Sequence, residues 1–208
     1  MADSPAGSPP APDAPPPPNR LKRGERRLQI LQVLAQMLES PHSERITTAT
    51  LAQRIGVSEA ALYRHYASKA QMFEGLIDFI EHSVFSLFNQ IAERPLPGRE
   101  QAQQMVKVVL RFGEQNPGMV RVMVGDALVY EHERLQQRMN HFFDRMESSL
   151  KQVLRPEAGA SISPSADAAL LAGVLTAWTQ GRLQRYARSG FRRAPTEQLD
   201  AALGVLLA

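Results

Sequence analysis

The sequence predicts an all-α protein in which a small N-terminal three-helix unit, containing a helix-turn-helix, precedes a larger helical body. Apolar residues recur at helical spacing from Arg20 onwards, whereas the alternation typical of strands is scarce. Prolines and glycines interrupt this pattern at intervals that suit helices of ordinary length. The 208 residues, of which 43% are hydrophobic and 22% charged, suffice for a buried core.

Residues 1–19 differ from the rest, because proline, alanine, serine, glycine and aspartate make up almost all of them. Proline donates no backbone hydrogen bond and is excluded from helix interiors. We therefore expect residues 1–19 to be a disordered tail that leans toward polyproline II.

Capping signals define the helices of the N-terminal half. Thr48 is the expected N-cap of the second helix, and Gly56 ends that helix in a left-handed conformation. Ser58 caps the third helix, and Ser68 with Gln71 forms a capping box at the start of the fourth. These helices are predicted, in order, over residues 22–40, 48–55, 58–66 and 68–93.

Helices of the C-terminal half end where proline or glycine breaks the apolar pattern. The breaks are Asn116-Pro117-Gly118, the loop over residues 156–164, and Ser189-Gly190. The periodicity between them predicts helices over residues 99–115, 118–130, 131–154, 165–188 and 195–207.

Basic residues are concentrated in one part of the chain, although the formal net charge is only +3. Residues 20–69 carry nine lysines and arginines against four acidic residues, whereas residues 70–208 are balanced. This distribution favours a module that faces a polyanion, joined to a neutral body. A solvated basic face would give the same charge, so charge alone leaves both interpretations open.

Several function classes are excluded by composition and motifs. The absence of cysteine excludes a disulfide framework, a cysteine nucleophile and cysteine-ligated metals. The sequence has no His-Glu-x-x-His motif and no phosphate-binding glycine loop, and Glu131-His132-Glu133 would point in different directions on a helix. We therefore expect no enzyme activity, metal or cofactor. Without a long apolar run or a signal-peptide core, we also expect a cytoplasmic location.

The most informative motif lies in residues 46–66, where Gly56-Val57-Ser58 joins two short helices. Gly56 permits a left-handed turn, Val57 fills the joint, and Ser58 begins the second helix. At about 100° per residue, the inward-pointing side chains are Leu51, Ala52, Ile55, Val57, Ala61, Leu62 and Tyr66. This is the geometry of a helix-turn-helix, whose second helix enters a DNA major groove. Two packed helices without DNA remain the alternative.

The outward face of the second helix suits DNA bases. Its small residues, such as Ala60, allow close approach to base edges, and Tyr63 and Arg64 can reach bases or phosphates. The N-termini of both helices can bind phosphates. The predicted DNA-binding residues are Arg23, Thr47, Thr48, Ser58, Glu59, Ala60, Tyr63, Arg64, His65 and Lys69.

Between Thr47 and Lys69 the pattern Thr-x-x-x-Leu-Ala-x-x-x-Gly-Val-Ser-x-x-x-Leu-Tyr-x-His-Tyr-x-Ser-Lys resembles the DNA-binding signature of the TetR family of bacterial regulators. The resemblance implies a DNA-binding domain over residues 20–69 and a helical domain for dimerisation and partner binding over residues 70–208. It also implies a homodimer formed mainly by the last two long helices, bound to palindromic DNA. The dimerisation residues would be Leu171, Val174, Leu175 and Trp178.

Further blocks are similar to one branch of this family, the nucleoid occlusion factors. They include Leu76-Ile-x-Phe-Ile-Glu81, Phe112-Gly-Glu-x-Asn-Pro-Gly118 and Gln152-Val-Leu-Arg155. The resemblance implies nucleoid association, with one or two dimers on each palindromic site, and capture of the C-terminal tail of the division protein FtsZ. That capture would antagonise division-ring assembly over the nucleoid. The tail-binding positions would be Phe79, Leu87, Val108, Arg111, Gln115 and Asn116.

Helical periodicity is compatible with a groove at these positions. Phe79 lies on the flank of one apolar helix face, and Val108, Arg111 and Gln115 share a flank of the next helix. If the flanks adjoin, they form a shallow groove suited to a peptide with apolar and acidic residues. Packing of Phe79 on another helix is the alternative. The sequence departs from the branch, in which glycine is often found in place of Arg111, arginine in place of Gln115 and sometimes arginine in place of Leu87.

A transcriptional repressor that responds to a small molecule is the alternative function, since it would share the fold and the helix-turn-helix. It would need a cavity with a few convergent polar groups in the helical body. The side chains that could supply them are Arg121, Trp178, Gln180 and Tyr186.

Overall fold

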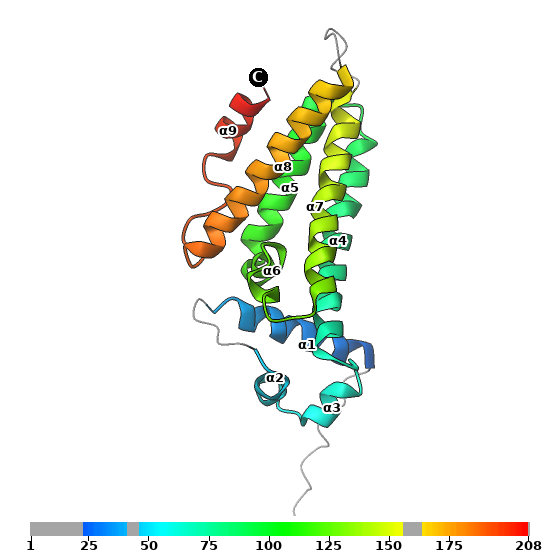
Figure 1. The fold of residues 1–208 in the computed structure, drawn as a ribbon, viewed down its shortest axis with the longest axis vertical. Helices are drawn as coiled ribbons and strands as arrows, with labels where there is room; N and C mark the ends of the chain where they lie inside the picture. Colours follow the sequence, from blue (N-terminus) through cyan, green and yellow to red (C-terminus); the bar gives the residue numbers. More distant parts are fainter. Residues whose placement is uncertain (1–22, 41–45, 156–163, 208) are drawn as a thin grey trace, which may run out of the picture.

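The computed structural model describes residues 23–40, 46–155 and 164–207, and these residues form helices and no strand. The predicted all-α fold class is confirmed (Figure 1). The tail expected over residues 1–19 lies outside the described residues. The elements are α1 (Arg23–Leu38), α2 (Thr48–Ile55), α3 (Glu59–Tyr63), α4 (Lys69–Ala92), α5 (Gly98–Gln115), α6 (Pro117–Met123), the 3-10 turn η1 (Asp126–Leu128), α7 (Glu133–Leu154), α8 (Pro164–Arg188) and α9 (Leu199–Leu206).

The three N-terminal helices lie together beneath one end of the long helices (Figure 1). α1 packs against α2, α4 and α6, and α2 packs against α3. Ile30, Leu34 and Leu38 bury one face of α1, as its apolar spacing predicts. The start of α4 therefore belongs to the packing of the N-terminal unit, while the rest of α4 extends into the body.

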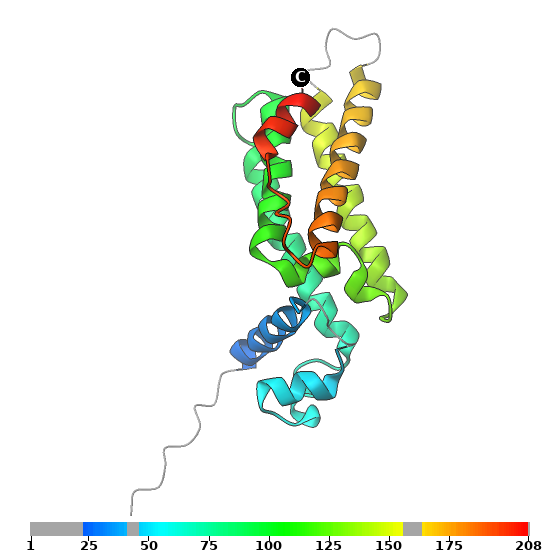
Figure 2. The same cartoon turned by 90° about the vertical axis from the view of Figure 1, so that its left-hand side faces the viewer.

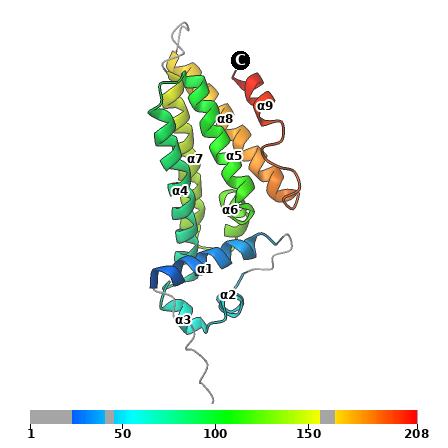
Figure 3. The ribbon, with the colours of Figure 1, turned by 180° about the vertical axis from the view of Figure 1, so that it is seen from behind.

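The body consists of the long helices α4, α5, α7 and α8, which run side by side (Figures 1 and 3). Its packing is tightest between α7 and α8 and between α4 and α5. Aromatic side chains fill the layer between α4 and α7, where the rings of Phe85 and Phe142 have centroids 5.2 Å apart. α9 runs along the outside of α5 and α8 (Figure 2). None of the described helices is long and apolar enough to span a membrane.

Three helices predicted in the C-terminal half begin or end at other residues in the structure. The helix expected over residues 118–130 ends at Met123, because Gly125 adopts a left-handed φ of 85° and the Gln136 side chain occupies the space beside it. The chain then forms η1, and α7 begins at Glu133 rather than 131. The helix expected over residues 195–207 begins only at Leu199, since Gln198 has a φ of 50°.

Capping at the N-terminal unit was predicted with two errors. The N-cap of α2 is Thr47 rather than Thr48, and the Thr47 hydroxyl accepts the Thr50 N–H at 3.1 Å. Ser68 caps α4 as predicted, accepting the Gln71 N–H at 3.2 Å. At α4, Gln71 Oε1 accepts the Ala67 N–H at 2.9 Å instead of the Ser68 N–H, so the capping box predicted there does not form. α3 spans only Glu59–Tyr63, shorter than the predicted 58–66, and a turn that returns to the Leu62 carbonyl follows it.

The N-terminal unit and the body meet at a close helix crossing. A Cβ on Gly118 of α6 would lie 2.0 Å from the carbonyl oxygen of Ala35 of α1, so only glycine permits this approach. Nearby, Arg121 of α6 donates to the Ser40 carbonyl at 3.0 Å. The position of the N-terminal unit relative to the body therefore depends on backbone contact rather than on adjustable side chains.

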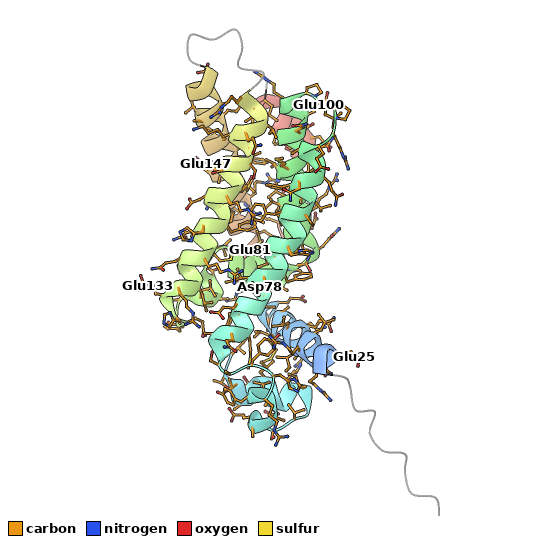
Figure 4. The ribbon with its side chains drawn as sticks, turned by 90° about the vertical axis from the view of Figure 1, so that its right-hand side faces the viewer. Glu25, Asp78, Glu81, Glu100, Glu133 and Glu147 are labelled. Atoms are coloured by element: carbon orange, nitrogen blue, oxygen red, sulfur yellow. The ribbon has the colours of Figure 1, made fainter. Side chains whose placement is uncertain are left out.

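Ion pairs attach the start of α7 to α4. Arg134 pairs with Glu74 at 2.8 Å, and Arg138 pairs with Asp78 at 2.5 Å and with Glu81 at 2.7 Å. Figure 4 labels Asp78 and Glu81 on α4 beside α7. The hydrogen bonds to Glu81 and Asp78 raise the pKa of Arg138 above its ordinary value, against the opposing effect of burial. These contacts hold the N-terminal part of α7 against the N-terminal half of α4.

Candidate nucleic-acid interface and candidate peptide groove

The turn between α2 and α3 has helix-turn-helix geometry. Gly56 adopts a φ of 78° and its N–H bonds the Ala52 carbonyl at 3.0 Å, which ends α2. The Val57 N–H reaches the same carbonyl, and Ser58 then caps α3 by accepting the Ala61 N–H at 3.2 Å. Leu51, Ala52 and Leu62 are buried beneath the turn, as predicted, whereas Ile55, Val57 and Ala61 are half-buried.

The opposite face of α3 is open. Ser58, Glu59, Ala60, Tyr63 and Arg64 are all exposed, and Tyr63 keeps 45% of its surface accessible. A recognition helix requires such a face, with small residues at its leading end and long polar side chains behind. The structure thus gathers the central part of the predicted DNA-binding set on one surface of the N-terminal unit.

Hydrogen bonds between α2 and α3 hold side chains of this face in place. The Thr48 hydroxyl donates to Glu59 Oε2 at 2.7 Å and accepts from the Tyr63 hydroxyl at 3.4 Å. Sequence reasoning identified these three residues separately but missed their connection, because they lie 11 and 15 positions apart. The network links Tyr63 of α3 to Thr48 at the start of α2, and it supplies Glu59 with a partner.

Most of the predicted DNA-binding residues at the edges of this face are less exposed than those at its centre. Thr47 is exposed and Thr48 is half-buried, both at the N-terminus of α2, while His65 is half-buried. The Lys69 amine pairs with Glu131 and lies 5.6 Å from the centroid of the Phe73 ring, with 19% of the side chain exposed. A phosphate contact by Lys69 would therefore compete with Glu131. Arg23 begins α1, but its side chain lies outside those described.

A second candidate site lies between α4 and α5. We call it the α4–α5 groove, a hollow of about 390 Å³ that includes Leu87, Val108 and Arg111 from the predicted set. Leu87 is 43% exposed, Val108 is half-buried and Arg111 is exposed. The groove also contains residues that sequence reasoning did not select, namely Gln90, Ile91, Arg94, Gln104 and Lys107.

The charge of the α4–α5 groove is positive. Arg94, Lys107 and Arg111 surround the apolar floor formed by Leu87, Ile91 and Val108. None of the described lining residues carries a carboxylate. Arg94 comes from the connection that follows α4, whereas Lys107 and Arg111 come from α5. Their convergence therefore depends on the antiparallel pairing of α4 and α5 and could not be found from either segment alone.

Phe79 lies on α4 nearer the N-terminal unit, beyond the lined hollow. It is 45% exposed, and its ring packs against Phe112 of α5 with centroids 6.1 Å apart. Asn116 donates through its side chain to the Phe112 carbonyl at 2.8 Å, and Gln115 is exposed. Of the predicted peptide-binding residues, Leu87, Val108 and Arg111 therefore line the α4–α5 groove, while Phe79 forms an aromatic shelf with Phe112, a residue that was not predicted. Gln115 and Asn116 follow Phe112 at the end of α5.

The predicted dimerisation residues on α8 divide into two groups. Leu175 has no exposed surface within the protomer, so it packs in the body of the protomer. Val174 is 42% exposed, and Leu171 and Trp178 are half-buried. Leu170, which sequence reasoning missed, is 70% exposed and lies one helical turn from Val174, on the same face. The exposed apolar stripe of α8 therefore contains Leu170 and Val174, and it lies on a different face from Leu175.

The four side chains suggested for a small-molecule cavity are engaged separately. Arg121 bonds the Ser40 carbonyl at the N-terminal unit, and Tyr186 donates to the Glu114 carbonyl at 3.4 Å. Burial raises the pKa of the Tyr186 phenol. Trp178 lies under Arg182, while Gln180 is exposed. Burial, with Arg185 nearby, lowers the pKa of Arg182. These residues do not form the convergent polar cluster that the alternative function requires.

Comparison with known proteins gives two family matches that together span most of the chain. Residues 43–76 match the family described as bacterial regulatory proteins of the tetR family. Residues 100–207 match an SlmA-like family described as tetracyclin repressor-like, C-terminal domain. The first match contains the helix-turn-helix, and the second begins near the start of α5.

Curated relatives carry a more specific name. The nucleoid occlusion factor SlmA of Alteromonas mediterranea is 48% identical over 183 residues, covering 86% of this chain and 93% of the relative. The protein of the same name from a Marinomonas species is 49% identical over 177 residues, covering 85% of this chain and 90% of the relative.

Solved structures share the fold. The TetR family transcriptional regulator PfmR of Thermus thermophilus superimposes with a TM-score of 0.67 at 21% identity, covering 86% of this chain and 97% of that chain. The fatty acid degradation regulator FadR of Bacillus halodurans gives a TM-score of 0.69 at 15% identity, covering 90% and 97%. At this identity the likeness concerns the fold alone.

Proposed function

The chain belongs to the TetR family of DNA-binding bacterial regulators, which are not enzymes, and on this premise we propose that it is a nucleoid occlusion factor. As a homodimer on palindromic chromosomal DNA, it binds the C-terminal tail of FtsZ and antagonises division-ring assembly over the nucleoid. The observation that carries the proposal is identity of 45–49% to relatives named SlmA over more than four fifths of the chain.

DNA binding follows from the open face of α3. With α3 in the major groove, Ala60 lies closest to the base edges, and Tyr63 and Arg64 contact bases or the adjoining phosphates. The N-termini of α2 and α3, at Thr47 and Ser58, direct backbone N–H groups toward phosphates. Two such units in a dimer read half-sites about one helical turn apart, so the site is a palindrome.

The α4–α5 groove and the aromatic shelf suit a short acidic, apolar peptide. Leu87, Ile91 and Val108 give an apolar floor, and Arg94, Lys107 and Arg111 supply positive charge. Phe79 and Phe112 offer an aromatic anchor at one end. We assign the FtsZ tail to this surface, with Phe79, Leu87, Val108, Arg111, Gln115 and Asn116 as its expected contacts.

The decisive experiment is a titration of a fluorescent FtsZ C-terminal tail peptide with the full chain, with and without a selected palindromic duplex. We expect saturable binding that Phe79→Ala removes while binding to the duplex is retained. The matched control is Phe143→Leu, a change at a buried aromatic position away from the groove, which should leave both affinities unchanged. A wild-type chain that binds the duplex but not the tail would contradict the proposal and favour a repressor.

A further inference from the structure

One residue of the α4–α5 groove already has an acidic partner. Lys107 of α5 lines the groove, and its amine lies 2.5 Å from a carboxylate oxygen of Asp200 of α9. The Lys107 side chain is 21% exposed, whereas that of Asp200 is 79% exposed. The pair therefore lies at the boundary between the groove and solvent, with the lysine on the inner side.

Asp200 also faces a second hollow next to the groove. This hollow, of about 420 Å³, lies between α5 and the segment that leads into α9, and it shares Arg111 with the groove. Asp200 thus sits between two cations that both line the groove. The hydrogen bond from Lys107, together with the charges of Lys107 and Arg111, lowers the pKa of the Asp200 carboxyl, so Asp200 is ionised at neutral pH.

We infer that Lys107 is a peptide-contacting residue of the α4–α5 groove. In the absence of the peptide, the Asp200 carboxylate pairs with the Lys107 amine in the place that an acidic side chain of the peptide would take. The inference rests on the proposed function and deepens it. When the peptide binds, one of its carboxylates replaces Asp200 at Lys107, and the Asp200 carboxylate turns to solvent. No atom is transferred, since one ion pair exchanges for another.

The exchange is feasible because α9 does not depend on this ion pair. Leu199 and Leu203 of α9 are buried, and Arg99 donates to the Leu207 carbonyl at the end of the helix. Breaking the Lys107–Asp200 pair therefore leaves α9 anchored. An ion pair whose carboxylate is mostly exposed contributes little net stability, which makes its replacement by a peptide carboxylate inexpensive.

The geometry also sets a minimum spacing for the acidic residue in the bound peptide. Phe112 of the aromatic shelf and Lys107 are five residues apart on α5, or about 8 Å along the helix axis. An extended peptide covers this distance in two to three residues at about 3.3 Å each. Five residues also rotate the helix by about 140°, so this separation is a minimum, and the groove selects a peptide whose carboxylate lies at least two or three residues from an apolar side chain seated on Phe79 and Phe112.

The test is a double-mutant cycle with the FtsZ C-terminal tail as the probe and the full chain as the binder. We expect Asp200→Asn to strengthen binding roughly 1.5- to 5-fold, the range expected for releasing one exposed ion pair. Lys107→Gln should weaken binding by a similar factor, and Asp200→Asn should have no further effect in the Lys107→Gln background. A tail peptide with its acidic side chains replaced by amides should not distinguish wild type from Lys107→Gln.

Two control variants distinguish loss of the proposed ion-pair exchange from loss of folded structure. Asp200→Glu keeps the charge and should restore wild-type affinity, while Glu74→Gln removes an ion pair on the far side of α4 and should change nothing. Tail binding that is equal for wild type, Asp200→Asn and Lys107→Gln would overturn the inference and leave the proposed function intact. Absence of tail binding by every variant, with duplex binding retained, would overturn the proposed function and the inference with it.

Discussion

Gly118→Ala tests whether the crossing of α1 and α6 fixes the N-terminal unit on the body. The added Cβ would lie 2.0 Å from the Ala35 carbonyl oxygen and 3.3 Å from Leu38 Cβ. Contacts shorter than 3.0 Å are essentially absent for real Cβ atoms, so the two helices must separate by about 1 Å. Overpacking of this kind costs about 1–3 kcal/mol, and a backbone obstacle that no rotamer change relieves puts the value at the upper end.

For a chain of this size, a loss of about 3 kcal/mol lowers the melting temperature by roughly 6–12 °C. Circular dichroism melts measure this change, and binding to a palindromic duplex measures whether α1 and α2 have moved with respect to the body. Ala35→Gly should not rescue the variant, because the obstructing atom belongs to the backbone.

Gly204→Ala on α9 is the matched control. No atom lies within 4 Å of the added Cβ, and an alanine inside a helix is favoured over glycine by about 0.5–1 kcal/mol, so the control should be slightly stabilised. If Gly118→Ala melts at or above the wild-type temperature and binds DNA normally, the crossing is not a constraint and the reasoning fails.

Four further predictions follow from the described side chains. Tyr63→Ala or Arg64→Ala should weaken binding to the palindrome by about 1–3 kcal/mol relative to unrelated DNA, measured by competition titration. If Lys69 leaves Glu131 and contacts a DNA phosphate, Lys69→Ala should reduce by about one the slope of the logarithm of the DNA-binding constant against the logarithm of the salt concentration. An unchanged slope would show that Lys69 pairs only with Glu131 and contacts no phosphate. Leu170→Glu with Val174→Glu should give a folded monomer in analytical ultracentrifugation, whereas Leu175→Ala should lower stability by about 2–5 kcal/mol without that dissociation. Because the pKa of Asp200 is lowered in the folded chain, the Lys107–Asp200 ion pair is present above pH 4 and is lost as the pH falls below the usual carboxyl value of 3.8. Since Leu199 and Leu203 keep α9 anchored, hydrogen exchange of α9 should change little across this range, both in the wild type and in Asp200→Asn.

Local signals in the sequence were sufficient for the turn between α2 and α3. Gly56 requires a left-handed turn and Ser58 supplies a cap, so the two helices and their buried faces follow from residues within about one turn of each other. The same kind of signal failed at Gly125, where the apolar pattern continues to residue 130 but the backbone has already turned. Periodicity alone does not reveal whether a glycine inside an apolar run ends a helix.

The groove could be predicted only in part. Val108 and Arg111 follow from their shared flank of α5, but Arg94 and Lys107 join them only because α4 and α5 pair antiparallel in this register. The partner of Lys107 lies 93 positions further along the chain, which no local pattern can indicate. Leu175 was assigned to the dimer because the sequence pattern of an apolar residue on α8 is the same whether the residue packs within the protomer or between two protomers. In the structure it is fully buried within the protomer.

The two candidate sites lie far enough apart along α4 to be used at the same time. From Lys69, at the DNA end of the helix, to Leu87, in the groove, is about 27 Å along the helix axis. This distance exceeds the Debye length of about 8 Å at physiological salt, so bound DNA should not repel an acidic peptide directly. Any coupling between duplex and tail binding must then pass through the helices and their packing, and the backbone contact of Gly118 with Ala35 is one connection that side-chain adjustment cannot relieve. If a duplex changes tail affinity in the wild type, Gly118→Ala should reduce that change more than it alters the affinity for the tail alone.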